Sequence, residues 1–281
     1  MAAIDPKNAI VFVTGAASGI GRSTVLALAA AGAQVIAADR RCAGLKALAS
    51  DAASQGARID TVVLDVTNAE AVAACAARLD DEGRTPDILV NNAGIGWMGG
   101  VFETPPEVWR RVLEVNLYGV LNGCQAFGPR MVAAGGRRLI VNVASLASIM
   151  PAANMAAYAA SKSAVEGLST VLGMELAETG VGVMCVHPGI INTPIVSDPN
   201  TVGASISPEQ LQRLQAYYQT KGCHPDVVAK AIVKGVRRGA SKVFTGPQAP
   251  STAILKRLLP HRLLSALGRS ASRQAGFLPQ P

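Results

Sequence analysis

Short apolar segments alternate along the chain with longer segments in which apolar residues recur at helical spacing. The short segments are rich in Val, Ile and Ala, a composition typical of strands that are buried on both faces. Alternation of such strands with helices favours a parallel sheet. Strands are expected at residues 10–13, 34–38, 61–64, 88–90, 139–143, 181–186 and 243–245, and helices at 22–31, 45–55, 70–82, on both sides of Asn116, at 158–179 and at 226–238. The pattern predicts a doubly wound α/β fold, with a single parallel sheet and helices on both of its faces.

No linker or low-complexity segment interrupts this pattern before residue 247, so residues 1–246 are expected to form one domain. Hydrophobic residues make up 49% of the chain and aromatic residues only 4%, which suits close packing of helices on a sheet. Residues 247–281 exceed what such a sheet needs. They are predicted to be an extension and not an independent domain.

Positive charge gathers near the C-terminus. Residues 222–281 contain ten Lys or Arg and one acid, Asp226, although the whole chain has a net charge of +7. Pro260 predicts two short helical turns in place of one long helix, and the polar residues 270–281 are expected to be disordered. This tail can pack on a neighbouring subunit, cover a substrate pocket or lie on an anionic membrane surface. We favour the subunit contact, because seven of the fifteen residues at 253–267 are large and apolar.

Cysteine and histidine usage narrows the chemistry. The five cysteines are scattered without CxxC spacing, so neither a disulfide framework nor a zinc site is predicted. His187, His224 and His261 are too far apart to suggest a metal site. The start of the chain lacks a basic and apolar leader, and no stretch approaches the ~20 apolar residues of a membrane span, so a cytoplasmic location is expected. The basic tail lacks interleaved aromatic residues, and no nucleic-acid partner is predicted.

The first strand leads directly into a glycine-rich turn. Its sequence is Thr14-Gly15-Ala16-Ala17-Ser18-Gly19-Ile20-Gly21, and a helix follows. Gly15 allows the tight turn, Gly19 lets the backbone approach a pyrophosphate, and Gly21 lets the helix pack closely on the strand. Phosphates would then meet the helix N-terminus beside Ser18 and Ile20. Glycines alone also occur in ordinary turns, but the strand–turn–helix context favours a dinucleotide site.

Asp39 ends the second strand about 20 residues after the turn, where a carboxylate can accept hydrogen bonds from the adenosine ribose. Its charge would repel a 2′-phosphate, so NAD is predicted as the cofactor and NADP is less favoured. Arg40 and Arg41 complicate this prediction, because a guanidinium can stack on adenine or bind a phosphate. Asp39 and Arg40 are both predicted to contact the cofactor.

Further motifs follow in order along the chain. They are Asp65-Val66, Asn91-Asn92-Ala93-Gly94, Asn116, Ser145, Tyr158-x-x-x-Lys162, and Pro188-Gly189 followed by Thr193. Together with the glycine turn, these motifs resemble those of the short-chain dehydrogenases/reductases over residues 8–246. The resemblance implies a single Rossmann-like domain, hydride transfer between a nicotinamide and an alcohol or carbonyl, and assembly as a homodimer or homotetramer.

The resemblance also implies roles for individual residues. Tyr158 is the general acid/base, Asn116 holds a water behind Lys162, and Lys162 also binds the nicotinamide ribose. The other cofactor contacts that it implies are Asp65, Val66, Asn92, Ala93, Gly94, Pro188, Gly189, Ile191 and Thr193.

The catalytic chemistry also follows from the residues themselves. Tyr158 and Lys162 are four residues apart in an expected helix, so both side chains lie on one face. A tyrosine pKa is ordinarily near ~10, and an adjacent ammonium and the positive ring of the oxidised cofactor would lower it. Tyr158 could then take a proton from an alcohol or return it to an alkoxide. Ser145 follows the fifth strand, where its hydroxyl can bind the substrate oxygen. A YxxxK pair alone also fits an amphipathic helix, but Ser145 and Asn116 in register favour catalysis.

The expected surroundings of the substrate are mostly apolar and offer no arginine that could clamp an anion. They comprise residues 95–98, 146–147, 153–155, Ile190 and the segment 195–221. This composition favours a lipophilic, uncharged secondary alcohol or ketone. Residues 211–218 form either a lid helix that presents Tyr217 or Tyr218, or a surface helix.

Two alternatives stay open on the same fold. One is non-redox chemistry with a bound cofactor, such as epimerisation or dehydration, and the other is a non-catalytic nucleotide-binding scaffold. His187 precedes the Pro188-Gly189 motif, and it is interpreted as structural because no carboxylate partner is evident for it.

Overall fold

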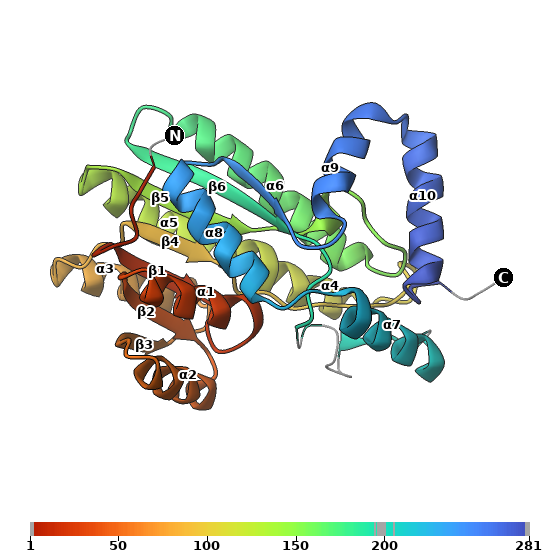
Figure 1. The fold of residues 1–281 in the computed structure, drawn as a ribbon, viewed down its shortest axis with the longest axis horizontal. Helices are drawn as coiled ribbons and strands as arrows, with labels where there is room; N and C mark the ends of the chain where they lie inside the picture. Colours follow the sequence, from red (N-terminus) through yellow and green to blue (C-terminus); the bar gives the residue numbers. More distant parts are fainter. Residues whose placement is uncertain (1–2, 194, 196–200, 205, 279–281) are drawn as a thin grey trace.

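The computed structural model describes residues 3–193, 195, 201–204 and 206–278. Its centre is a seven-stranded sheet in the order β3-β2-β1-β4-β5-β6-β7, in which every neighbouring pair of strands is parallel (Figure 1). The strands are β1 (Ile10–Thr14), β2 (Gln34–Asp39), β3 (Ile59–Val63), β4 (Ile88–Asn91), β5 (Arg138–Val143), β6 (Val181–Pro188) and β7 (Lys242–Thr245). The predicted doubly wound α/β sheet is confirmed.

Helices connect the strands and cover both faces of the sheet (Figure 1). They are α1 (Gly19–Ala30), α2 (Cys42–Ser54), α3 (Ala69–Asp81), α4 (Pro106–Leu113), α5 (Gly119–Ala133), α6 (Ala156–Glu175), α7 (Pro208–Lys221), α8 (Asp226–Arg238), α9 (Ala249–Leu258) and α10 (His261–Gln274). A π-helical turn, Glu114–Tyr118, joins α4 to α5, and a short 3₁₀ helix, Leu146–Ser148, follows β5.

Alternation along the strands builds two apolar layers. In β1, Val11 and Val13 join the cluster formed with α1, α2 and α8, whereas Phe12 between them joins the cluster formed with α3, α5 and α6. Successive side chains of a strand point to opposite faces, so a fully apolar strand such as β1 must be covered on both. Phe12 is fully buried against Phe127, and its replacement by Ala is expected to cost about 3–5 kcal/mol of stability.

The carboxyl ends of the strands lie at one edge of the sheet, because all the strands run in the same direction. The chain order reverses between β1 and β4, which are neighbours at the centre of the sheet. Ligands of doubly wound sheets bind in the crevice outside such a switch point. The residues that end β1, β2, β4 and β5 therefore border one site.

The tail is more ordered than the sequence predicts. The two helical turns expected around Pro260 are the complete helices α9 and α10, which stand as a hairpin beside the sheet (Figure 1). The expectation of disorder at 270–281 is wrong for residues 270–278. Ser272 Oγ accepts a hydrogen bond of 3.1 Å from the Ala153 amide, and the Asn154 side-chain amide donates one of 2.6 Å to the Phe277 carbonyl. Residues 279–281 lie outside the described part of the chain.

Candidate active site

A cavity of about 660 Å³ lies at the carboxyl edge of the sheet. The predicted site residues that line it are Gly15, Ser18, Gly19, Ile20, Asp39, Arg40, Asp65, Val66, Asn92, Ala93, Gly94, Ser145, Tyr158, Lys162, Pro188, Gly189, Ile191 and Thr193. Gly21 and Asn116 are buried behind this wall. The structure thus brings together residues that are spread over most of the chain.

The glycine turn forms a close-packed cradle at one end of the cavity. A Cβ on Gly21 would lie 2.1 Å from the Gly15 carbonyl oxygen, so only glycine fits where α1 meets the turn. Gly15 has a φ of +65°, and its Cβ would lie 2.7 Å from Ala93 Cα. Ser18 precedes α1, and its side chain does not cap the helix. The N–H groups of the first turn of α1 therefore remain available to a phosphate.

Thr14 and Asn92 join the turn to the end of β4. Thr14 Oγ1 accepts hydrogen bonds from the amides of Asn92 (3.0 Å) and Ala93 (3.1 Å), and the Asn92 side-chain amide donates to the Thr14 carbonyl at 3.0 Å. Asn91 instead donates to Asn142 at 2.9 Å inside the core. Asn91 and Asn92 therefore hold the end of β4 in place, and Thr14 is a positioning residue that was not predicted from the sequence.

Asp39 holds the base of the turn through its carboxylate. One oxygen accepts from the Ala17 amide at 3.0 Å, and the other accepts from the Arg41 amide at 2.9 Å. Arg41 also reaches across the cavity mouth, because its guanidinium donates to Ser18 Oγ at 2.7 Å. The Arg41 guanidinium therefore bridges Asp39 and Ser18, a role that the sequence does not predict. Arg40 is exposed at the rim of the cavity.

Tyr158 and Ser145 meet in the wall of the cavity. Burial raises the pKa of Tyr158, and a hydrogen bond with the Ser145 hydroxyl works against this rise. The lowering expected from the Lys162 ammonium is absent in the chain by itself. Lys162 Nζ instead donates a hydrogen bond of 2.9 Å to the Val143 carbonyl, and burial lowers the pKa of Lys162 to about 8. Tyr158 is therefore a neutral phenol at pH 7 in the cofactor-free chain.

Asn116 lies within the π-helical turn, where sequence reasoning placed only a junction of two helices. Its side chain is fully buried. Its Oδ1 accepts from the Ile95 amide at 2.8 Å, and its Nδ2 donates to the Ile95 carbonyl and to Ser161 Oγ, both at 3.0 Å. A Cβ on Gly94 would lie 3.3 Å from Asn116 Oδ1 and 3.4 Å from Lys162 Nζ. Asn116 therefore ties the loop after β4 to α6 and borders Lys162 at Gly94.

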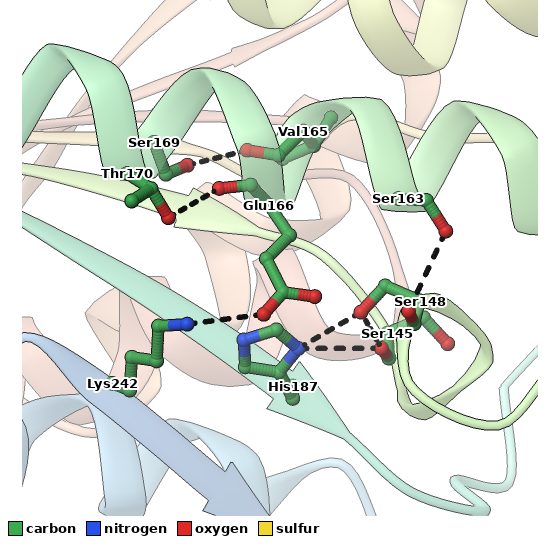
Figure 2. A network of polar contacts seen from close by, with 9 residues as sticks. All are labelled: Ser145, Ser148, Ser163, Val165, Glu166, Ser169, Thr170, His187 and Lys242. Atoms are coloured by element: carbon green, nitrogen blue, oxygen red, sulfur yellow. Dashed lines mark hydrogen bonds and ion pairs between the residues drawn. The ribbon is translucent and has the colours of Figure 1, made fainter. Parts of the chain in front are cut away.

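His187 lies beside Ser145 and Ser148 (Figure 2), and it is not among the residues that line the cavity. It is fully buried, and its Nδ1 lies 3.1 Å from Ser148 Oγ and 3.4 Å from the Ser145 carbonyl oxygen. Burial lowers the pKa of His187, and the Glu166 carboxylate, which is paired with Lys242 at 3.0 Å, works against that shift. The expectation that no carboxylate tunes His187 is wrong, because α6 brings Glu166 to it. The contacts agree with a structural role in holding the loop that carries Ser145.

The other half of the cavity is mostly apolar, and segments from the middle and the end of the chain build it. Residues 95–98 and 146–147, Met155, Ile190 and parts of 195–218 line it, as the sequence predicts. Ala153 and Asn154 do not line it, and residues 196–200 and 205 lie outside the described part of the chain. From α7, Leu211, Leu214, Tyr217 and Tyr218 form one wall, so this helix is more than a surface helix.

The tail closes this apolar half. Gly268, Ala271, Ser272 and Ala275 line the cavity together with Phe277. Covering of the substrate pocket is one of the three alternatives that the sequence leaves open for the tail, but none of these residues is predicted for it. Gly268, Ala271 and Ala275 are small residues spaced three and four positions apart, a pattern that predicts a shared face of α10. In the described residues of this half, Lys162 is the single charged side chain, because Asp39, Arg40, Arg41 and Asp65 all lie at the cofactor end.

A family model for short chain dehydrogenases matches residues 9–201. The chain is 40% identical over 262 residues to the probable oxidoreductase EphD of Mycobacterium tuberculosis, covering 92% of this chain but only 44% of that protein. It is also 38% identical to a trans-4-hydroxycyclohexanecarboxylate dehydrogenase of Sinomonas cyclohexanicum, over 67% of this chain and 74% of that one. The chain belongs to the short-chain dehydrogenase/reductase family.

Solved structures of the family agree with this assignment. A Burkholderia phymatum member in complex with NAD superposes with a TM-score of 0.80 at 27% identity, over 95% of this chain and 97% of that one. A Burkholderia cenocepacia member in complex with NADP superposes with a TM-score of 0.75 at 30% identity, over 94% and 99% of the two chains. Solved relatives of this chain therefore include complexes with NAD and complexes with NADP.

The described residues contain no group of three or more His, Cys, Asp or Glu side chains that could hold a metal ion. They also contain no helix that is both long enough and apolar enough to cross a membrane.

Proposed function

We propose that this protein is an NAD-dependent dehydrogenase/reductase that interconverts an uncharged, lipophilic secondary alcohol and its ketone, with Tyr158 as the general acid/base. The observation that carries the proposal is the division of the cavity. Charged side chains border its cofactor end, and the described side chains of the other half are apolar apart from a few polar groups and Lys162. A site of this kind favours a neutral substrate, because burying an unpaired charge there is costly.

The residues at the charged end fit a nicotinamide dinucleotide. Gly15 and Gly21 pack closely without side chains, so a pyrophosphate could approach the backbone of the turn. The N–H groups at the start of α1 would face it. Asp39 lies at the end of β2, where its carboxylate suits a ribose hydroxyl and opposes a 2′-phosphate. The bound nicotinamide would supply the hydride acceptor or donor. Asp65, Val66, Asn92, Ala93, Gly94, Pro188, Gly189, Ile191 and Thr193 are proposed as its further contacts.

Tyr158 would move the proton. As a neutral phenol hydrogen-bonded to Ser145, it can donate its proton to the oxygen of a ketone as that oxygen gains negative charge. The Ser145 hydroxyl would bind the same oxygen and stabilise that charge. In the direction of alcohol oxidation Tyr158 must first lose its proton, and a positive nicotinamide ring beside it would favour that loss.

Lys162 and Asn116 support this proton transfer. The Lys162 ammonium is held by the Val143 carbonyl, and Asn116 borders it at Gly94. The side chain of Asn116 is already engaged by Ile95 and Ser161, so its first effect is to fix α6, which carries both Tyr158 and Lys162. We propose that these two residues also hold the water that returns a proton to Tyr158.

A matched pair of substrates tests the neutral-substrate proposal. We would offer 4-methylcyclohexanol and trans-4-hydroxycyclohexanecarboxylate with NAD and with NADP, and follow the absorbance of the reduced nicotinamide. We expect kcat/KM to be at least about tenfold higher for the methyl compound and for NAD, since a buried unpaired charge costs more than the ~1.4 kcal/mol that tenfold represents. A preference for the carboxylate would contradict the proposal, because the apolar half would then have to recognise an anion.

We propose that the chain assembles as a homodimer or homotetramer, as its family resemblance implies. All five cysteines are free thiols, which is the state that a reducing compartment such as the cytoplasm maintains. We also propose that residues 247–281 are an extension of the catalytic domain and not a separate domain, because α10 lines its cavity.

A further inference from the structure

The α9–α10 hairpin is anchored at its base and exposed at its tip. At the base, Ala249 and Thr252 of α9 are buried, and Ser272 and Phe277 are tied to the loop at 153–154. Between these anchors, Leu258 is 73% exposed and Leu263 is 54% exposed. Figure 1 shows the connection between the two helices at the end of the hairpin that lies farthest from α7. The tip therefore projects while its base belongs to the substrate cavity.

Large apolar side chains occupy the outward face of the hairpin. On α9 they are Ile254, Leu255 and Leu258, and on α10 they are Leu263 and Leu267. At 100° per residue, Ile254 and Leu258 on α9 lie far from the buried Ala249 and Thr252, whereas Leu255 is one turn from Thr252. Leu263 and Leu267 are one turn apart on α10, and Leu263 lies away from the residues that line the cavity.

Three arginines border these apolar side chains. Arg262 and Arg269 are two turns apart on one flank of α10, and Arg257 flanks the apolar face of α9. All three are exposed, and no acidic residue follows Asp226 in the sequence. We call these three arginines and the five apolar residues the tail patch.

The charge of the tail patch argues against a second copy of the chain as its partner. A twofold interface would bring the tail patches of two copies together, and with them six arginines and no carboxylate of the patch. Like charges that face each other in this way are destabilising. A partner that is anionic and can receive projecting apolar side chains suits the patch better, and a lipid surface has both properties.

We propose that the tail patch is a membrane-docking surface, through which the protein binds peripherally to bilayers that contain anionic lipid. The apolar side chains of α9 and α10 would enter the boundary between headgroups and acyl chains, and the arginines would contact lipid phosphates. The sequence favours subunit packing for the tail, and we propose membrane docking in its place at this face.

The position of the patch gives the docking a consequence for catalysis. The same helix α10 presents Leu263 and Leu267 outward and Gly268 and Ala271 to the cavity. A bilayer at the outer face would therefore lie one helix away from the substrate half of the cavity. This consequence rests on the proposed lipophilic substrate, whereas the docking itself does not.

Co-sedimentation with vesicles tests the docking without any substrate. The full chain is mixed with sucrose-loaded vesicles of pure phosphatidylcholine, or of phosphatidylcholine with 30 mol% phosphatidylglycerol, at low and at high salt. The charge variant is Arg257→Gln with Arg262→Gln and Arg269→Gln. Its matched control is Lys230→Gln with Lys234→Gln and Arg237→Gln, which removes three exposed cations from α8.

We expect the wild type to bind the anionic vesicles at low salt and to be released at high salt. The tail variant should bind about 100-fold more weakly, since each cation near an anionic surface contributes about fivefold, and the α8 control should bind within about threefold of the wild type. Leu258→Ser with Leu263→Ser should also weaken binding, in contrast to Val63→Ser with Val101→Ser, which removes equally exposed apolar side chains elsewhere.

Three results would overturn the proposal. They are failure of the wild type to bind anionic vesicles at low salt, equal weakening by the tail and α8 charge variants, and a lower oligomeric state of the leucine variant by analytical ultracentrifugation in lipid-free buffer. The last result would assign the patch to a second copy of the chain. Each readout is independent of turnover, so failure of the docking leaves the proposed reaction untouched.

Discussion

The two halves of the cavity are built in different ways. The cofactor half comes from the turns that directly follow β1, β2 and β4, where a few backbone contacts fix each position, as at Gly15 and Gly21. The substrate half is assembled from loops and from α7 and α10, which lie outside the sheet. Short motifs at strand ends therefore specify the cofactor site, whereas the substrate site depends on how distant segments pack together.

The largest effect is expected from a substitution of Tyr158, where the two halves of the cavity meet. Tyr158→Phe removes the proton donor and is expected to lower kcat for ketone reduction by about 10³-fold, while NAD binding changes little. Stopped-flow measurement of reduced nicotinamide and titration of NAD would separate the two effects. Tyr217→Phe is the control, because Tyr217 also lines the cavity but its hydroxyl accepts from Gln248 at 2.9 Å. Equal losses in both variants would remove Tyr158 from its proposed role.

A second effect concerns Lys162, which the fold buries beside Tyr158. Its pKa falls from 10.5 to about 8, so the folded chain binds fewer protons than the unfolded chain between those pH values. Lys162 therefore makes the wild type more stable as pH rises through this window, by about 2–3 kcal/mol between pH 7 and pH 10. Urea denaturation of the wild type and Lys162→Met at both pH values should show the stability difference moving by that amount in favour of the wild type. A difference that is independent of pH would mean that Lys162 is not desolvated.

A substitution of Asp39 tests which cofactor the charged half of the cavity prefers. Asp39→Asn keeps an acceptor for the Ala17 amide but removes the charge that opposes a 2′-phosphate. The ratio of kcat/KM for NADP to that for NAD is expected to rise by at least about tenfold, given about 4 kcal/mol for close like charges near a protein surface. Asp65→Asn, at the other carboxylate of the cavity wall, should leave this ratio within about twofold. An unchanged ratio in the Asp39 variant would indicate that Arg40 and Arg41 decide the preference.

The smallest expected effect lies in the apolar half. Ala271→Leu places a larger side chain on the cavity face of α10 and should lower kcat/KM for bulky alcohols by about tenfold, with small alcohols and NAD affinity nearly unchanged. Ala266→Leu on the exposed side of the same helix is the matched control. Steady-state kinetics with alcohols of increasing size would measure both variants. If the two variants behaved alike, α10 would not bound the substrate site.

The sequence by itself determined the parallel sheet and most of the residues that line the proposed cofactor half of the cavity. Apolar runs such as 10–13 predict buried strands because a doubly covered strand leaves no polar position, and the glycine turn predicts the cradle because other residues cannot fit there. The spacing of Tyr158 and Lys162 predicts a shared helix face for the same local reason.

Only the tertiary structure decided how these groups are tuned and what surrounds the substrate. Burial raises the pKa of Tyr158 although a lysine lies four residues further along the motif, and the Nζ of that lysine donates to the Val143 carbonyl. Glu166 reaches His187, and α10 closes the cavity more than 100 residues after Tyr158. The spacing of residues along the sequence predicts neither desolvation nor contact between distant segments, since both depend on the packing of the whole chain.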